Sequence, residues 1–209
     1  RRNPQILKQQ LRAMLRAADG SPQAKVMFPM VASLDEFVAA RDLAPGCQEE
    51  LRREGLPHRM PELGMMIELP SATMMLPELA AAADFLSIGS NDLIQYLLAV
   101  DRTNDEVAAW YAPHHPAVLR SLNWIVESAN KAGKPVSLCG NLASDERMLP
   151  FLLGIGLRTF SMDPMAIPAV QRRIEQIDLD QARAQARRML SFGRIEEVAD
   201  YLKTIAPAG

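Results

Sequence analysis

Five short apolar runs, separated by longer segments with helical periodicity, constrain the fold of this chain more than any other feature. Each run is short and mostly apolar, and several end at proline or glycine, which is typical of buried strands. The runs cover residues 25–31, 62–69, 84–88, 135–140 and 159–162. Because strands that alternate with helices pair in parallel through right-handed crossovers, this pattern predicts an α/β protein with a parallel sheet.

Helical patterns fill the remaining segments. Ser33, with Glu36 three residues later, forms the sequence signature of a capping box and predicts a helix over residues 33–54. Ser71 is expected to cap the helix that follows the second run. That helix is expected over residues 71–80. Further helices are expected over residues 1–18, from 93 onward, and over 116–132, 145–153, 167–177, 179–190 and 195–205.

Five strand–helix units leave two architectures open. They fit a complete open doubly wound sheet, or the later part of a (β/α)8 barrel. No Gly-x-Gly-x-x-Gly motif follows the first run, so the dinucleotide-binding version of the doubly wound fold loses support. At 209 residues the chain is expected to form one domain.

Composition excludes several classes of protein. The net charge of −2 gives no basic surface for nucleic acid, and no apolar stretch approaches the roughly 18–20 residues of a membrane span. No signal peptide is expected either, because the N-terminus lacks an apolar core segment. Cys47 and Cys139 lie far apart in sequence, so a reduced, cytoplasmic setting is expected rather than a disulfide framework. Cys47 is expected on a surface helix without a chemical role.

The stretch from Phe85 to Leu93 concentrates chemistry at the end of one predicted strand. Gly89 lets the backbone approach a ligand closely, and Asn91 and Asp92 follow where α/β folds place their ligands. Arg102 then supplies a cation. A carboxylate, an amide and an arginine so close in sequence indicate a site for Mg²⁺ and an anion. A simple turn that caps a helix explains Asn91 and Asp92 equally well.

Polar or reactive residues also end the neighbouring runs. Glu68 ends an apolar strand, where its carboxylate would be costly unless paired or bound to a cation. Two carboxylates, here Glu68 and Asp92, suit Mg²⁺, which fills its remaining positions with water and substrate oxygens. A buried ion pair is the alternative. In chain order, the four polar strand ends are Glu68, Asn91 with Asp92, the segment 139–141, and Ser161.

Cys139 has two interpretations. A lone cysteine on a strand is usually a small buried hydrophobic residue. Its place at a strand end, level with Asp92, also fits chemistry: a thiol with an ordinary pKa of about 8.5 is protonated at neutral pH and can donate a proton to an enolate, or act as a nucleophile. No histidine adjoins it in sequence to favour the thiolate.

Several strings in these regions resemble the PEP-utilising enzymes, and among them the C-terminal domain of phosphoenolpyruvate–protein phosphotransferases. These proteins are Enzyme I of the sugar phosphotransferase system and its nitrogen-related paralogue. The resemblance runs from about residue 3 to residue 190. It is carried by residues 11–17 (LRAMLRA), 26–30 (VMFPM), 64–71 (GMMIELPS), 85–102 (FLSIGSNDLIQYLLAVDR) and 138–145 (LCGNLASD).

The resemblance implies a fold and a mechanism. Residues 1–209 would form a single PEP-binding domain, a (β/α)8 barrel present only as about strands 4 to 8 with C-terminal helices. Glu68 and Asp92 match the family's Mg²⁺ ligands, and Asn91, Asp92 and Arg102 belong to its PEP site. Cys139 matches the thiol that protonates the enolate at C3. The phosphoryl group would pass to a histidine of a separate N-terminal domain and on to a histidine phosphocarrier protein, releasing pyruvate, and the protein would be a homodimer.

Two departures from the family bear on activity. The chain begins after the place of the first three barrel strands and the histidine domain, so we expect it to be inactive alone. Asn141 stands where the family usually has glutamate, which affects the surroundings of Cys139. A PEP-sensing or dimerising module without turnover is therefore an alternative. The corresponding domain of pyruvate phosphate dikinase or PEP synthase is another.

Overall fold

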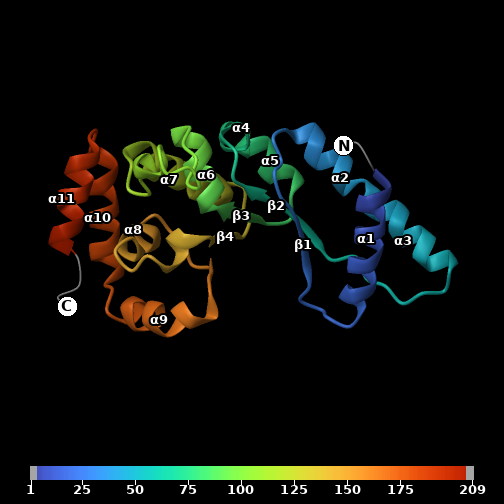
Figure 1. Cartoon of the computed structure of the whole chain (residues 1–209). Coiled ribbons are helices and arrows are strands. Elements are labelled where there is room, and N and C mark those ends of the chain that lie inside the picture. Colours follow the sequence, from blue (N-terminus) through green and yellow to red (C-terminus); the bar gives the residue numbers. More distant parts are fainter. Residues whose placement is uncertain (1–3, 206–209) are drawn as a thin grey trace.

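A computed structural model describes residues 4–205 as a five-stranded parallel sheet with helices packed around it (Figure 1). The strands are β1 (Lys25–Phe28), β2 (Glu62–Ile67), β3 (Leu86–Gly89), β4 (Val136–Cys139) and β5 (Phe160–Ser161). The helices are α1 (Pro4–Asp19), α2 (Leu34–Arg41), α3 (Leu43–Arg53), α4 (Pro70–Met74), α5 (Leu76–Ala82), α6 (Ser90–Leu98), α7 (Pro116–Lys131), α8 (Leu149–Gly154), α9 (Ile167–Glu175), α10 (Leu179–Ser191) and α11 (Ile195–Ile205), with short 3-10 turns η1 (Ala108–Trp110), η2 (Asn141–Ser144) and η3 (Pro164–Ala166).

The strand order in space equals the strand order in sequence, β1-β2-β3-β4-β5, and every pairing is parallel. A doubly wound sheet reverses its order at a switch point. The described sheet has no such reversal, so the doubly wound alternative is wrong. Right-handed crossovers that always advance in one direction place their helices on one face of the sheet. Figure 1 shows this arc, from α1–α3 beside β1, through α4–α7, to α8, α10 and α11.

The two faces of the sheet differ in chemistry. In a parallel pair, residues in register point to the same side, and successive residues alternate between the two sides. One face consists of large apolar residues that are fully buried under the helices, among them Met65, Ile67, Ile88 and Leu138. The other face carries small, polar or half-exposed side chains. Its residues include Met27, Gly64, Met66, Ser87, Gly89, Ser137, Cys139 and Ser161.

Local sequence signals explain several helix ends. Ser33 accepts a hydrogen bond from the N–H of Glu36 at 3.3 Å, as the capping box predicts. The Glu36 carboxylate accepts in return from the N–H of Ala32, at 2.7 Å, one residue earlier than expected. At the end of α7, Gly133 has φ +66°, and left-handed glycine is a common helix terminator.

Four sequence-based expectations are wrong in detail. The helix over 33–54 is two helices, because the chain turns at Asp42 between α2 and α3. Ser71 does not cap, since α4 begins at Pro70 without a side-chain cap. The helix expected to begin at residue 93 begins at Ser90, the first polar residue after β3. Asp145 does not begin a helix; η2 precedes it and α8 starts at Leu149, one residue before Pro150. The placement expected for Cys47 is correct: it lies on α3, a helix with an exposed outer side, and its own side chain is fully buried.

No helix in the part of the chain that the structure describes has the length and apolar character needed to cross a membrane.

Candidate functional site

The candidate site lies at the carboxyl ends of the adjacent strands β2, β3 and β4. Glu68 directly follows β2, Asp92 lies in the first turn of α6 just after β3, and Cys139 is the last residue of β4. Because β3 pairs with both β2 and β4, these three ends adjoin one another. The structure therefore brings together the carboxylates and the thiol that the sequence singled out.

The Glu68 carboxylate is buried, with only 3% of the residue exposed. Its Oε1 accepts a hydrogen bond from the backbone N–H of Met30, 2.6 Å away. Burial raises the pKa of Glu68, the nearby Asp92 raises it further, and the Met30 hydrogen bond opposes the increase. A buried carboxyl group beside a second carboxyl group is a site where a bound cation would be strongly favoured.

Gly89 explains how Glu68 fits between neighbouring strands. A Cβ at Gly89 would lie 2.8 Å from Oε2 of Glu68 and 2.8 Å from Sδ of Met66. A Cβ at these distances would require the Glu68 or Met66 side chain to move, so the absence of a side chain at Gly89 leaves the space that Glu68 occupies.

Asp92 and Arg102 form an ion pair beside Glu68. Nη2 of Arg102 lies 3.3 Å from Oδ1 of Asp92, and both side chains are about one-third exposed. Tyr111 contacts the same guanidinium group: burial raises the pKa of Tyr111, while a hydrogen bond with Arg102 lowers it. Arg102 is thus held at the edge of the site, with part of its surface open to solvent.

Asn91 contacts the backbone of the next strand end. Its Oδ1 accepts from the N–H of Asn141 at 2.9 Å, and Ser90 donates its hydroxyl to the carbonyl of Cys139 at 2.7 Å. Gly140 between them has φ +92°, and a Cβ there would lie 2.5 Å from Oγ of Ser90. The first turn of α6 therefore fixes the turn that carries Cys139. The Asn141 contact uses only its backbone, so a glutamate at this position would make the same bond.

The Cys139 thiol faces the two carboxyl groups. It donates to the carbonyl of Ile88 with Sγ and O 3.4 Å apart. Burial raises the pKa of Cys139, and the nearby Glu68 and Asp92 raise it further, whereas a hydrogen bond with Ser87 lowers it. The thiol is therefore held in its protonated form near neutral pH, which suits a proton donor better than a nucleophile.

The described residues do not enclose a metal ion. Within residues 4–205, no group of three or more His, Cys, Asp and Glu side chains is placed to hold one. Glu68 and Asp92 are a pair, and Mg²⁺ commonly binds one or two carboxylates and completes its octahedron with water and substrate. The donor set fits Mg²⁺ better than a structural metal with four protein ligands.

Sequence reasoning assigned no role of its own to four residues that shape the site: Met30, Ser90, Tyr111 and Gly140. Met30 follows Pro29 and contributes only its backbone N–H, so its residue type carried no signal. Gly140 had one available signal, a glycine directly after a reactive strand end. Tyr111 comes from a distant part of a long connection, and only tertiary contact reveals it.

Comparison with known proteins identifies relatives across most of the chain. Residues 1–179 match a family described as PEP-utilising enzyme, PEP-binding domain. The chain is 40% identical over 200 residues to the phosphoenolpyruvate-protein phosphotransferase of Bacillus subtilis (strain 168), covering 95% of this chain and 35% of that protein. It is 41% identical over 196 residues to a Salmonella typhimurium protein named phosphoenolpyruvate-dependent phosphotransferase system, covering 93% of this chain and 26% of that protein. The chain thus spans about a third or less of these relatives.

A solved structure of a citrate lyase from Burkholderia xenovorans LB400 superposes on the chain with a TM-score of 0.59. The alignment covers 95% of this chain and 67% of that one at 16% sequence identity. At this identity the likeness supports the α/β fold alone.

Proposed function

Because the chain belongs to the family of PEP-utilising enzymes and matches its PEP-binding domain over residues 1–179, we propose that it is the PEP-binding, Mg²⁺-dependent part of a phosphoenolpyruvate–protein phosphotransferase. The observation that carries this proposal is the meeting of Glu68, Asp92 and Cys139 at three adjacent strand ends, with Arg102 paired to Asp92. These groups supply the cation ligands, the phosphate contact and the proton donor that such a reaction needs.

Glu68 and Asp92 would hold Mg²⁺. The burial of Glu68 beside Asp92 supports this assignment, because the pair is destabilised as two anions without a cation. Bound Mg²⁺ would offset negative charge on the phosphoryl and carboxylate groups of PEP, and such electrostatic stabilisation dominates phosphoryl transfer.

Arg102 would contact the phosphoryl group from the side of Asp92. Its guanidinium is partly exposed and already oriented by Asp92 and Tyr111, so substrate oxygens can reach it without moving the chain. Asn91 would contact PEP through its amide nitrogen, since its Oδ1 accepts from Asn141. Each of these groups orients substrate before any bond breaks.

Cys139 would act as the general acid. When the phosphoryl group leaves, enolpyruvate carries its electrons toward C3, and the Cys139 thiol donates its proton there to form pyruvate. The raised pKa of Cys139 supports this role, because the thiol keeps its proton at neutral pH until the enolate forms.

The described strands would be about strands 4 to 8 of a (β/α)8 barrel. Their sequential order and the arc of helices support this placement. The phosphoryl group would pass to a histidine in an N-terminal domain and then to a histidine phosphocarrier protein. The two free thiols are in keeping with a cytoplasmic protein.

We extend the proposal to a homodimer. Met74 on α4 is 77% exposed and Trp124 on α7 is 42% exposed. The two helices adjoin, since Nε1 of Trp124 donates to the carbonyl of Thr73 at 2.9 Å. These residues supply an apolar surface for a second copy. Light scattering should detect a dimer of the full-length protein, and Met74→Asp should shift it toward monomer.

The test of the proposed function is to incubate the full-length protein with PEP and Mg²⁺ and to measure pyruvate and acid-labile phosphohistidine. Both should form without any nucleotide, and adding a histidine phosphocarrier protein should convert this single transfer into continued pyruvate formation, which separates this function from that of a dikinase or a PEP synthase. The 209-residue chain alone should form neither. Binding of PEP without either product would favour a sensing module and contradict the proposed transfer.

A further inference from the structure

Met30 has an unusual backbone conformation. Among residues 4–205, only Met30 and Ala99 are non-glycine residues with positive φ, at 53° and 52°. Ala99 ends α6, where the left-handed conformation is common. Met30 ends no helix; it follows Pro29 in the segment between β1 and α2. Left-handed backbone is unfavourable for a residue with a side chain, so it persists only where its surroundings require it.

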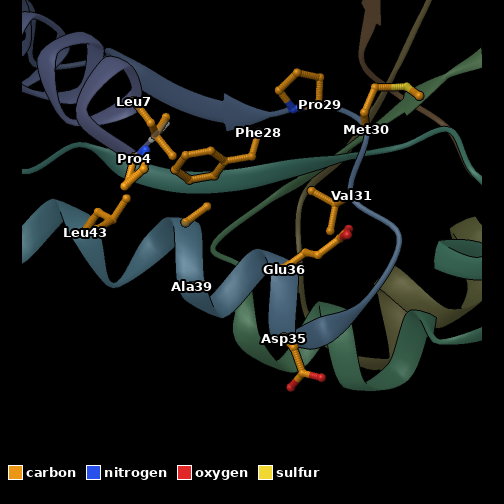
Figure 2. A pocket seen from close by; sticks show the side chains of 11 residues that line it. Pro4, Leu7, Phe28, Pro29, Met30, Val31, Asp35, Glu36, Ala39 and Leu43 are labelled. Atoms are coloured by element: carbon orange, nitrogen blue, oxygen red, sulfur yellow. The ribbon is translucent and has the colours of Figure 1, made fainter. Parts of the chain in front are cut away.

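The Met30 side chain does not provide the reason. It is 50% exposed and borders a pocket of ≈ 690 Å³ between β1, α1 and α2. Figure 2 shows the side chain extending away from the apolar group formed by Pro4, Leu7 and Phe28. Burial of apolar surface therefore offers little compensation for the backbone conformation.

The backbone N–H of Met30 does provide a reason. It is the first N–H after Phe28, because Pro29 has none, and it donates to Oε1 of Glu68 at 2.6 Å. The angle φ sets the direction of the following chain relative to the Pro29–Met30 peptide plane. A left-handed Met30 lets the chain turn toward α2 while its N–H continues to face Glu68.

Two features locate the Glu68 carboxylate: a hydrogen bond and an open space. Met30 binds Oε1, and the open face of Gly89 receives Oε2, which lies 2.8 Å from where a Cβ of residue 89 would stand. Rotation of the carboxylate away from Met30 would break this hydrogen bond. Asp92 lies close to the same carboxylate.

We propose that Met30 is a positioning residue, whose left-handed backbone aims its N–H at Glu68 and so orients that carboxylate toward a bound divalent cation. This inference rests on the proposed function, in which Glu68 holds Mg²⁺. It assigns the role to the main chain: any residue that adopts positive φ readily serves, and residue size or polarity matters little.

The test compares substitutions that separate backbone from side chain. Asn and Gly adopt positive φ readily, Leu matches Met in shape and backbone preference, and Val is apolar but β-branched and strongly disfavoured there. Binding of Mn²⁺, as a probe for Mg²⁺, is measured on the full-length protein by calorimetry. Circular dichroism checks that each variant is folded.

Met30→Asn, Met30→Gly and Met30→Leu should retain wild-type Mn²⁺ affinity, whereas Met30→Val should bind about tenfold more weakly, as is typical when a partner of a metal ligand is disturbed. A side-chain role predicts the opposite order, with Asn and Gly impaired and Val tolerated. That order, or equal affinity in all four variants, would overturn the inference.

A second measurement removes the donor itself. Incorporating the α-hydroxy analogue of methionine at position 30 replaces the N–H by an ester oxygen and leaves the side chain intact. Mn²⁺ affinity should fall by about tenfold or more, and unchanged affinity would overturn the inference. If the wild-type protein binds no Mn²⁺ at all, both this inference and the magnesium proposal fail. If it binds Mn²⁺ while the ester has no effect, only the inference fails.

Discussion

The helical layer of α1 and α3 and the carboxyl end of the sheet carry the same residue types in opposite surroundings. In the helical layer, Glu49 is partly exposed and pairs with Arg52 and Arg53, which lower its pKa. At the strand ends, burial raises the pKa of Glu68. The difference shows that the tertiary environment, and not the residue type, determines the direction in which the pKa of each glutamate is shifted.

The two cysteines extend the comparison. Cys47 is fully buried among the side chains that join α3 to the core, and its Sγ donates to the carbonyl of Lys8 with a separation of 3.7 Å. Cys139 is partly exposed and faces Glu68 and Asp92. Burial raises the pKa of both thiols and both have charged neighbours, but Cys47 is enclosed in the core whereas Cys139 is partly exposed beside the two carboxyl groups at the strand ends.

The largest effect is expected from replacing the two thiols in turn. Cys139→Ala in the full-length protein should still permit phosphorylation by PEP, but it should slow hydrogen–deuterium exchange at the pyruvate methyl group by ~10²–10⁴-fold, because a general acid is lost. Cys47→Ala should leave exchange unchanged and cost about 1–2 kcal/mol of unfolding free energy, because it removes a buried side chain. Unchanged exchange in Cys139→Ala would mean that this thiol donates no proton and contributes only to packing.

The two glutamates give the next largest difference. Glu68→Gln should lower the rate of pyruvate formation by about 10²–10³-fold, since it removes a charged ligand from the place where negative charge develops. Glu49→Gln, the matched control, should keep the wild-type rate. Steady-state kinetics at saturating Mg²⁺ would measure both, and equal rates in all three proteins would rule out Glu68 as a ligand.

Two left-handed glycines sharpen the comparison further. Gly140→Ala should lower activity at least about tenfold, because its Cβ would displace Ser90 and Asn91 and move the turn that carries Cys139. Gly133, at the end of α7, has φ +66°, and a Cβ at this position would meet nothing within 4 Å. Gly133→Ala should cost only about 1 kcal/mol of stability through its backbone and leave activity intact. Urea unfolding measures the cost of backbone strain in each variant, and kinetics measures the effect of displacing Ser90 and Asn91. Equal activity losses in the two variants would contradict this distinction.

The smallest effect is a difference in the pH dependence of stability without divalent cations. A raised pKa means that folded Glu68 keeps its proton to higher pH than the unfolded chain, so wild-type stability should fall relative to Glu68→Gln as the pH rises above the ordinary value of 4.5. Glu49 has a lowered pKa, so wild-type stability should fall relative to Glu49→Gln as the pH decreases through the acid range. Urea titrations with a chelator present would measure both trends, and trends of the same sign would contradict the comparison.

Several features of the fold followed from local sequence. Strand–helix alternation predicted the parallel sheet, and all five strands lie within or directly beside the predicted runs. The strings around residues 64–71, 85–102 and 138–145 indicated the family to which the chain belongs. Helix boundaries were less predictable, because Ser90, Asn91 and Asp92 suit both a turn and the first turn of a helix.

The sequence by itself determined which residues stand at the strand ends, because apolar runs and their terminating glycines and prolines are local properties. It therefore placed Glu68, Asp92 and Cys139 at one end of a sheet. Only the tertiary structure decided their surroundings. Strand order brought the three ends side by side, Met30 turned its N–H toward Glu68, and α6 fixed the Cys139 turn through Ser90. These contacts join residues about 40 to 50 positions apart, and burial and hydrogen bonding at such separations depend on the complete packing of the chain rather than on any local pattern.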